Sequence, residues 1–216
     1  MLELGLKTLI AYLLGSLMGA LLVGVAQGVD IREFGSGNAG GTNALRTQGF
    51  WFAAATVVVD VGKGWLAAGW LPGLVIPGIA ADAAVDRGWL TAACAAAAVI
   101  GHVWPLFHEF RGGKGGATLV GALLALAPLI VVVVIAVWLV VVMLTGLVGL
   151  ATMTAAVAMP VAVWVLGPQG EPLLAFAIAM AALIVFAHRS NIARMNAGTE
   201  PRMNRLWLLR PRNPGP

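Results

Sequence analysis

Residues 115–170 read GGATLVGALLALAPLIVVVVIAVWLVVVMLTGLVGLATMTAAVAMPVAVWVLGPQG, and this stretch contains neither a charged residue nor a histidine. A helix that crosses a membrane needs about 20 apolar residues, and no core helix of a soluble protein is as long as this stretch. Within a bilayer the backbone must satisfy its own hydrogen bonds, which leaves helices or a closed barrel. The apolar positions are continuous rather than alternating, which excludes the barrel. We therefore predict an all-α, polytopic integral membrane protein.

The composition of the whole chain agrees with a membrane protein. Of its 216 residues, 60% are hydrophobic and 10% are charged, whereas a soluble domain averages about 25% charged residues. Most of the 13 lysines and arginines stand singly in loops or in the tail after Phe186. This arrangement favours retention on the cytoplasmic side and contact with anionic lipids, so we expect membrane lipids and no nucleic acid as partners. The single cysteine, Cys94, excludes a disulfide framework.

Helix-breaking residues divide the apolar chain into spans. Four spans are predicted at about 5–28, 50–71, 89–107 and 172–188. The remaining uncharged segment, 117–167, could be filled by two long helices or three short ones. Proline and glycine near 129–132 and 146–149 favour three spans of about 13 to 18 residues, which is shorter than a standard span. The total is then about seven transmembrane helices.

Basic residues orient these spans. The loops 29–49 and 108–116 both carry basic residues, and two spans separate them, so they lie on one side of the membrane. If there are seven spans, the C-terminal tail lies on the same side of the membrane as these two loops. This tail holds six of the 13 basic residues. The positive-inside rule then predicts that the N-terminus is outside and the C-terminus inside, with Lys7 as a minor exception. We expect one transmembrane domain over 1–209 and a disordered tail over 210–216.

A glycine-rich segment follows the first span. Residues 34–43 read FGSGNAGGTN, and Arg46 comes shortly after them. Glycines allow backbone N–H groups to turn toward an anion, and Ser36, Asn38 and Thr42 add polar side chains. The segment contains the dinucleotide-binding pattern G-x-G-x-x-G, but no strand precedes it, so that interpretation is rejected. A flexible surface turn is the alternative, and the density of polar residues favours an anion site.

A second glycine-rich loop surrounds Lys114. Residues 110–118 read FRGGKGGAT and follow GHVWP at 101–105. The loop fails the spacing of a Walker A motif, because Gly115 follows the lysine where serine or threonine is required. A helix that begins near Ala117 would still present unpaired N–H groups to an anion, and Lys114 adds a full charge. The alternative is a basic anchor at the membrane surface.

Polar residues at the ends of spans add further candidates. His102 is a ligand or base in one interpretation and a packed, hydrogen-bonded side chain in the other, while His108 is a loop residue without a chemical role. The last span ends in His188-Arg189-Ser190-Asn191. Histidine and arginine would favour a helix C-terminus in any case, but the segment lies on the same predicted side as the two loops.

Asp60 and Lys63 stand inside the second predicted span. Three residues apart, they share one side of a helix. Ionisable residues within a membrane are costly and usually have a function or a partner. Either they form an internal ion pair that orients the helix, or they support the site.

Taken together, these segments resemble the bacterial acyl-phosphate:glycerol-3-phosphate acyltransferase family. The resemblance covers the whole chain in order. It rests on GSGNAGGTN with Arg46, on DVGKG at 60–64, on GHVWPLF and FRGGKGGAT, and on His188-Arg189-Ser190-Asn191. The family implies a seven-helix enzyme of the bacterial cytoplasmic (inner) membrane, with its active site facing the cytoplasm.

The resemblance also implies a reaction, which is the first step of bacterial phospholipid synthesis. A fatty acyl phosphate would donate its acyl group to the 1-hydroxyl of sn-glycerol 3-phosphate, giving 1-acyl-sn-glycerol 3-phosphate (lysophosphatidic acid) and phosphate. No cofactor and no metal is expected, and neither is a protein general base, because the acyl phosphate itself takes the hydroxyl proton. We also expect a monomer.

Motif positions assign the residues of this site. Those expected to hold glycerol phosphate and to act in catalysis are Ser36, Arg46, Lys114, His188 and Asn191. Those expected to bind substrate otherwise are Asn38, Thr42, Asn43, Gly112, Gly113, Gly115, Arg189 and Thr152. Asp60, Lys63 and His102 are expected to support them. The chain departs from the family in two places: Gly41 replaces the usual alanine, and Gly149 and Thr152 stand where two small hydroxyl residues are common.

Two other classes of protein compete with the enzyme. A transporter or channel for an organic anion would suit glycine-broken helices and an intramembrane ion pair. Its polar groups would lie mid-membrane, however, whereas here they gather at one face, and no inverted repeat is visible. A structural membrane subunit would leave the composition of the loops unexplained.

Overall fold

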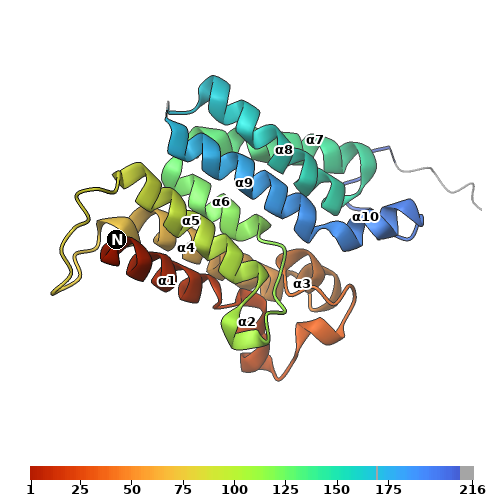
Figure 1. The fold of residues 1–216 in the computed structure, drawn as a ribbon. Helices are drawn as coiled ribbons and strands as arrows, with labels where there is room; N and C mark the ends of the chain where they lie inside the picture. The colour runs from red at the N-terminus through yellow and green to blue at the C-terminus, as the bar shows by residue number, and fades with distance from the viewer. Residues whose placement is uncertain (169, 210–216) are drawn as a thin grey trace, which may run out of the picture.

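The structure is a computed structural model that describes residues 1–168 and 170–209, and these residues form a helical bundle (Figure 1). The predicted tail at 210–216 lies outside the described residues. The α-helices are α1 (Leu2–Gly15), α2 (Gly19–Gln27), α3 (Gly41–Thr47), α4 (Phe50–Trp65), α5 (Arg87–Val103), α6 (Gly116–Leu126), α7 (Pro128–Thr145), α8 (Val148–Leu166), α9 (Glu171–Ala187) and α10 (Arg189–Asn196). Helix α4 continues through a π-helical turn and a 3₁₀ turn to Gly73.

Among the described residues, four helices are long and apolar enough to cross a membrane. They are Phe50–Gly73, Arg87–His108, Pro128–Thr145 and Val148–Leu166. Two bent pairs also pass the test when each is taken as one span: α1 with α2, bent by 43°, and α9 with α10, bent by 50°. Length and composition therefore allow up to six spans, and α6 is a shorter apolar helix. An all-α membrane protein is confirmed, while the count of seven and the orientation of the termini stay predictions.

The uncharged segment divides into three helices, as the breakers indicated. Helix α6 ends where Pro128 begins α7, and α7 ends at Gly146, which has a φ of 71°. Proline lacks the N–H that a helix interior needs but fits its first turn, so it separates the two helices cleanly. The first break lies just before the predicted range of 129–132. With 11 residues, α6 is the shortest of the three.

Glycines bring the helices of one half of the bundle into close contact. A β-carbon on Gly15 or Gly101 would collide with the backbone of the facing helix where α1 packs against α5. A β-carbon on Gly64 or Gly121 would likewise collide with the backbone of the facing helix where α4 packs against α6. Without a hydrophobic drive between helices in lipid, such close packing is a main source of association. Helices α7, α8 and α9 form the other half, which meets the first through α5, α6 and α9.

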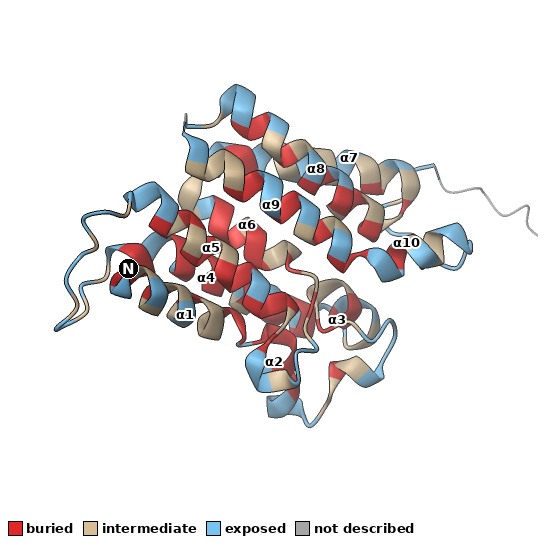
Figure 2. Cartoon of the chain, in the orientation of Figure 1, coloured by how far each residue is buried: buried red, intermediate tan, exposed pale blue. Residues whose placement is uncertain are grey.

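Exposed residues lie along the outer faces of the helices (Figure 2), and many of them are large and apolar. Val58 is 71% exposed and Trp164 69%, as expected of surfaces that face lipid. The largest buried cluster lies between the two halves and includes Leu123, Ile130 and Met159, all fully buried. Figure 1 places α2, α3 and α10 at one end of the bundle and the N-terminus, with loop 74–86, at the other.

Asp60 and Lys63 form hydrogen bonds with the unpaired backbone groups where the helix breaks between α1 and α2. The Lys63 ammonium donates to the carbonyl oxygens of Gly15 and Leu17, each at 2.8 Å, where α1 ends. The Asp60 carboxylate accepts from the N–H of Gly19, at 3.1 Å, where α2 begins, and pairs with Lys63 at 3.0 Å. Helix ends leave unpaired N–H and C=O groups, which are costly in lipid. The ion pair is therefore architectural, and it fixes the bend that leads into the first glycine-rich segment.

A second charged cluster lies at the opposite end of the bundle. Lys7, only 2% exposed, donates to Glu3 at 2.7 Å and to the carbonyl oxygen of Pro72 at 2.8 Å. Arg87 donates to the same carboxylate at 2.9 Å. Lys7 is thus held by an internal partner, which accounts for a basic residue on the predicted outer side.

Replacing Lys63 with methionine should destabilise the protein. The change leaves the Asp60 carboxylate buried without its cation and two carbonyls without a donor, so a loss of about 3 to 5 kcal/mol is expected. Thermal unfolding of the purified protein in detergent measures it. Val58→Met, on the exposed side of the same helix, should unfold like the wild type; equal midpoints for both variants would contradict the architectural role.

Candidate functional site

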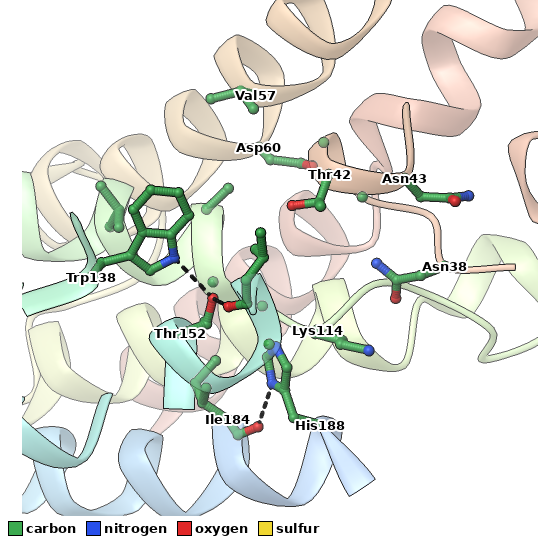
Figure 3. A pocket seen from close by; sticks show the side chains of 18 of the residues that line it. Asn38, Thr42, Asn43, Val57, Asp60, Lys114, Trp138, Thr152, Ile184 and His188 are labelled. Atoms are coloured by element: carbon green, nitrogen blue, oxygen red, sulfur yellow. Dashed lines mark hydrogen bonds between the residues drawn. The ribbon is translucent and has the colours of Figure 1, made fainter. Parts of the chain in front are cut away.

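A cavity of about 610 Å³ opens at the end of the bundle where α3 and α10 lie and runs between α4, α6, α7, α8 and α9. Figure 3 shows Asn38, Lys114 and His188 around one part of it and Trp138 and Thr152 in another. The polar residues that line it include Ser36, Asn38, Thr42, Asn43, Arg46, Asp60, His102, Lys114, Thr152, His188, Asn191, Arg194 and Glu200. Three loops that are far apart in sequence thus meet at one cavity.

Asn43 shapes the first loop from within. Its side chain is 2% exposed; it accepts from the N–H of Ser36 at 3.0 Å and donates to the carbonyl of Phe34 at 2.9 Å. Gly35 has a φ of 60°, and a β-carbon there would collide with the Asn43 amide. Position 35 therefore requires glycine, both for its positive φ and for the lack of space for a β-carbon. Asn43 therefore holds the loop, and Ser36 and its polar neighbours are left to face the cavity.

His102 anchors the second loop. Its carbonyl accepts from the N–H of Gly113 at 3.1 Å, and its ring lies so close to Gly113 that a β-carbon there would collide with Nε2. On the other side, His102 Nδ1 lies 3.4 Å from the Asp60 carboxylate. Gly112 and Gly113 are consequently used in packing against His102 and do not line the cavity, whereas Lys114 and Gly115 do.

Lys114 stands at the start of a helix. Gly115, with a φ of 83°, is the N-cap of α6. A left-handed residue at this point is readily supplied by glycine. The first turn of α6 contributes unpaired N–H groups and the positive end of the helix dipole to the cavity. Helix and lysine together form an anion-binding arrangement.

Glu200 organises the third segment, and sequence reasoning missed it. Lys114 donates to Asn191 Oδ1. Asn191 Nδ2 donates to Glu200 at 2.6 Å, and Arg194 donates to the other oxygen of Glu200 at 2.7 Å. The Glu200 side chain is 3% exposed. A signal was present, because this is the only acidic residue after Glu171 in a basic tail.

His188 is held in one orientation. Its Nδ1 lies 2.7 Å from the carbonyl of Ile184 (Figure 3), and since a carbonyl can only accept, Nδ1 carries a hydrogen. Nε2 of the neutral ring is then the acceptor. Arg189, next in the chain, does not line the cavity; its guanidinium lies 4.7 Å from the centre of the Phe186 ring.

The segment after α10 lies beside the mouth of the cavity. Arg46 donates to the carbonyl of Pro201 at 3.1 Å. The N–H of Met203 donates to the carbonyl of Gly146 at 2.7 Å, which ties the segment to the end of α7. Met203 and Leu206 both line the cavity.

Gly149 and Thr152 have separate tasks on α8. A β-carbon on Gly149 would lie 2.6 Å from Asn191 Nδ2, so glycine lets Asn191 approach the helix. Both the oxygen and the nitrogen of the Asn191 amide are hydrogen-bonded, so moving this side chain away would break those bonds. The Thr152 hydroxyl donates to the carbonyl of Val148 at 2.9 Å and accepts from Trp138 Nε1 at 3.2 Å.

The cationic end of the cavity carries an excess of positive charge. Burial, together with the charges of Arg194, Arg189 and Arg46 and against the opposing effect of Glu200, lowers the pKa of Lys114 to about 8. The described part of the chain contains no group of three or more His, Cys, Asp or Glu placed to hold a metal ion. The site is thus built to bind an anion beside an apolar compartment.

Comparisons with known proteins agree on one family. A sequence model of the glycerol-3-phosphate acyltransferase family matches residues 6–198. A glycerol-3-phosphate acyltransferase of Thermosynechococcus vestitus is 42% identical over 207 residues, which cover 93% of this chain and 95% of the relative. One of Salinibacter ruber is 42% identical over 91% of this chain and 90% of its own length.

Two solved structures share the fold. They are PlsY, an integral membrane glycerol 3-phosphate acyltransferase, in its glycerol 3-phosphate form and in its lysophosphatidic acid form. Their TM-scores are 0.80 and 0.78, each at 32% identity, over 92% of this chain and 94% of theirs.

The lowered pKa of Lys114 predicts how anion binding depends on pH. The ammonium is charged below about pH 8 and loses its charge as the pH rises through that value, instead of near the ordinary 10.5. The affinity for sulfate, whose charge is constant in this range, should therefore fall between about pH 7 and pH 9. Calorimetric titration in detergent measures it. The guanidinium of Lys114→Arg stays charged over this range, so its affinity for sulfate should not fall with pH. An equal fall in the variant would mean that a group other than Lys114 causes the pH dependence.

Proposed function

Since this chain belongs to the glycerol-3-phosphate acyltransferase family, we propose that it takes the acyl group from a fatty acyl phosphate and transfers it to the 1-hydroxyl of sn-glycerol 3-phosphate. It is an integral membrane acyltransferase that converts glycerol 3-phosphate to lysophosphatidic acid. The observation that carries the finer proposal is the cavity itself, which joins a cationic, glycine-rich mouth to an apolar compartment. In this proposal the mouth holds the two phosphate groups, and the compartment holds the acyl chain.

Glycerol 3-phosphate is assigned to the cationic mouth. Arg46 and Lys114 neutralise its phosphate, with Ser36 as a hydrogen-bonding neighbour. His188 Nε2 can accept from a glycerol hydroxyl. Asn191 has a second task, because its amide joins Lys114 to Glu200 and so holds the ammonium in place.

The phosphate of the acyl donor is assigned to the start of α6 and the first loop. The N–H groups after Gly115 and the side chains of Asn38 and Thr42 face the same part of the cavity. Gly112 and Gly113 serve this site indirectly, through the packing of their loop on His102.

The reaction needs positioning more than acid–base catalysis. The glycerol hydroxyl oxygen attacks the acyl carbonyl carbon, the bond from that carbon to the phosphate oxygen breaks, and the departing phosphate takes the hydroxyl proton. An acyl phosphate is already activated, so alignment of the two substrates and stabilisation of the phosphate charge supply the acceleration. Asp60 and Glu200 are each engaged by other side chains, so this scheme gives neither carboxylate the role of a base.

The decisive experiment supplies purified protein with an acyl phosphate and glycerol 3-phosphate and measures released phosphate. Release that requires both substrates, with lysophosphatidic acid as the second product, supports the proposal. No release, together with glycerol 3-phosphate flux through protein-containing vesicles, would replace it with transport. An acyl thioester in place of acyl phosphate tests the donor.

Lys114→Ala should reduce turnover by at least about 100-fold, because the cation that holds the phosphate of glycerol 3-phosphate in position for attack is lost. Its thermal unfolding should stay close to that of the wild type. Arg32→Ala, which removes a guanidinium paired with Asp30 outside the cavity, is the matched control and should retain activity. Near-normal rates for Lys114→Ala would refute the assigned role.

We also propose that the mouth of the cavity faces the cytoplasm, since the basic loops gather there. Cysteines at Ser36 and at Phe107, which is 55% exposed, should react with a membrane-impermeant maleimide only from the cytoplasmic side. A cysteine at Val75, which is 84% exposed at the other end of the bundle, should react only from outside. The native Cys94 is fully buried and gives little background. The opposite pattern would invert the topology.

A further inference from the structure

We propose that Met159 limits how deep the acyl chain can enter the cavity and so sets the upper end of the chain-length preference. This inference rests on the proposed acyltransferase function and assigns a specificity-determining residue to it. Two features point to Met159: the face that α8 presents to the cavity, and the residues that close the cavity beneath that face.

Helix α8 presents a stripe of small side chains that ends in a large one. Gly149, Thr152, Ala155, Ala156 and Met159 all line the cavity. Their spacing of three and four residues puts them on one side of the helix. The first four leave room along the helix, whereas the Met159 side chain fills that room and is fully buried.

Beyond the lining, each helix around the cavity carries buried residues of the central apolar cluster that do not line the cavity. They include Leu123 on α6, Ile130 on α7, Val163 on α8 and Met180 on α9. Met159 is the last residue along α8 that lines the cavity, and its buried side chain belongs to that cluster. On this face of α8 it therefore forms the floor at which a straight chain must stop.

The depth of the compartment corresponds to a fatty chain of moderate length. Gly149 lies beside Asn191 at the cationic mouth, and ten residues separate it from Met159, or about 15 Å of helix. A staggered hydrocarbon chain advances roughly 1.3 Å per carbon, so about 12 carbons fit between the mouth and the floor. Longer chains compete with the Met159 side chain for space.

The test compares acyl phosphates of 12 to 18 carbons with the full-length enzyme in detergent or vesicles. In Met159→Ala, the ratio of kcat/KM for the longest chain to that for the shortest should rise by about tenfold, because room for extra methylenes is worth about this much in an apolar pocket. In Ala156→Leu the ratio should fall by a similar factor. Met159→Leu, which conserves volume, should keep the wild-type ratio.

Met180→Ala is the matched control. It makes the same change in the same cluster, at a residue that is 3% exposed and outside the cavity lining. It should lower stability as much as Met159→Ala without altering the ratio. An unchanged ratio in both Met159→Ala and Ala156→Leu would overturn the proposal and mean that the chain leaves between α4 and α7 above Met159. Failure of the wild type to release phosphate with any chain length would instead overturn the proposed function.

Discussion

The need to satisfy backbone polar groups inside lipid governs the structure from the break between α1 and α2 onward. Where the chain turns, Lys63 supplies donors to the carbonyls of Gly15 and Leu17, and Asp60 accepts from Gly19. Unpaired, these groups would cost several kcal/mol in hydrocarbon. The same carboxylate faces His102, on which the lysine loop packs. One buried ion pair thus supports both glycine-rich segments, although neither of its members need touch a substrate.

The cationic mouth depends on an opposite charge that is not offered to the substrate. Arg46, Lys114 and Arg194 would repel one another if they were brought together alone. Glu200 pairs directly with Arg194 and reaches Lys114 through the Asn191 amide. Because Glu200 is engaged by these partners, the surplus of positive charge remains for anions. The segment after α10 is for this reason part of the site rather than a surface tail.

The sequence was sufficient to predict the membrane fold, the three loops and the family, because long apolar runs and glycine–lysine clusters have few alternative explanations. It could not assign tasks within the loops. Whether Gly113 faces the cavity or His102 depends on a contact with a distant span, and so does the close approach of Gly149 to Asn191. Glu200 escaped notice because its partners lie on helices that only the folded chain brings together. Local pattern identifies the chemistry present, and tertiary contact decides which residue performs it.

The sides of the cavity have a kinetic consequence. Phe50 and Val57 on α4 and Ile135 on α7 line it and are also 64%, 40% and 44% exposed, so part of its wall consists of exposed apolar side chains. A donor with a long apolar tail would enter sideways from the leaflet, whereas a small water-soluble acceptor arrives through the mouth. The effective concentration of the acceptor is therefore its concentration in water, whereas that of the donor is its mole fraction in the lipid. Diluting the enzyme's surroundings with inert lipid should slow encounters with the donor alone, as expected of a catalyst that works at the boundary of two phases.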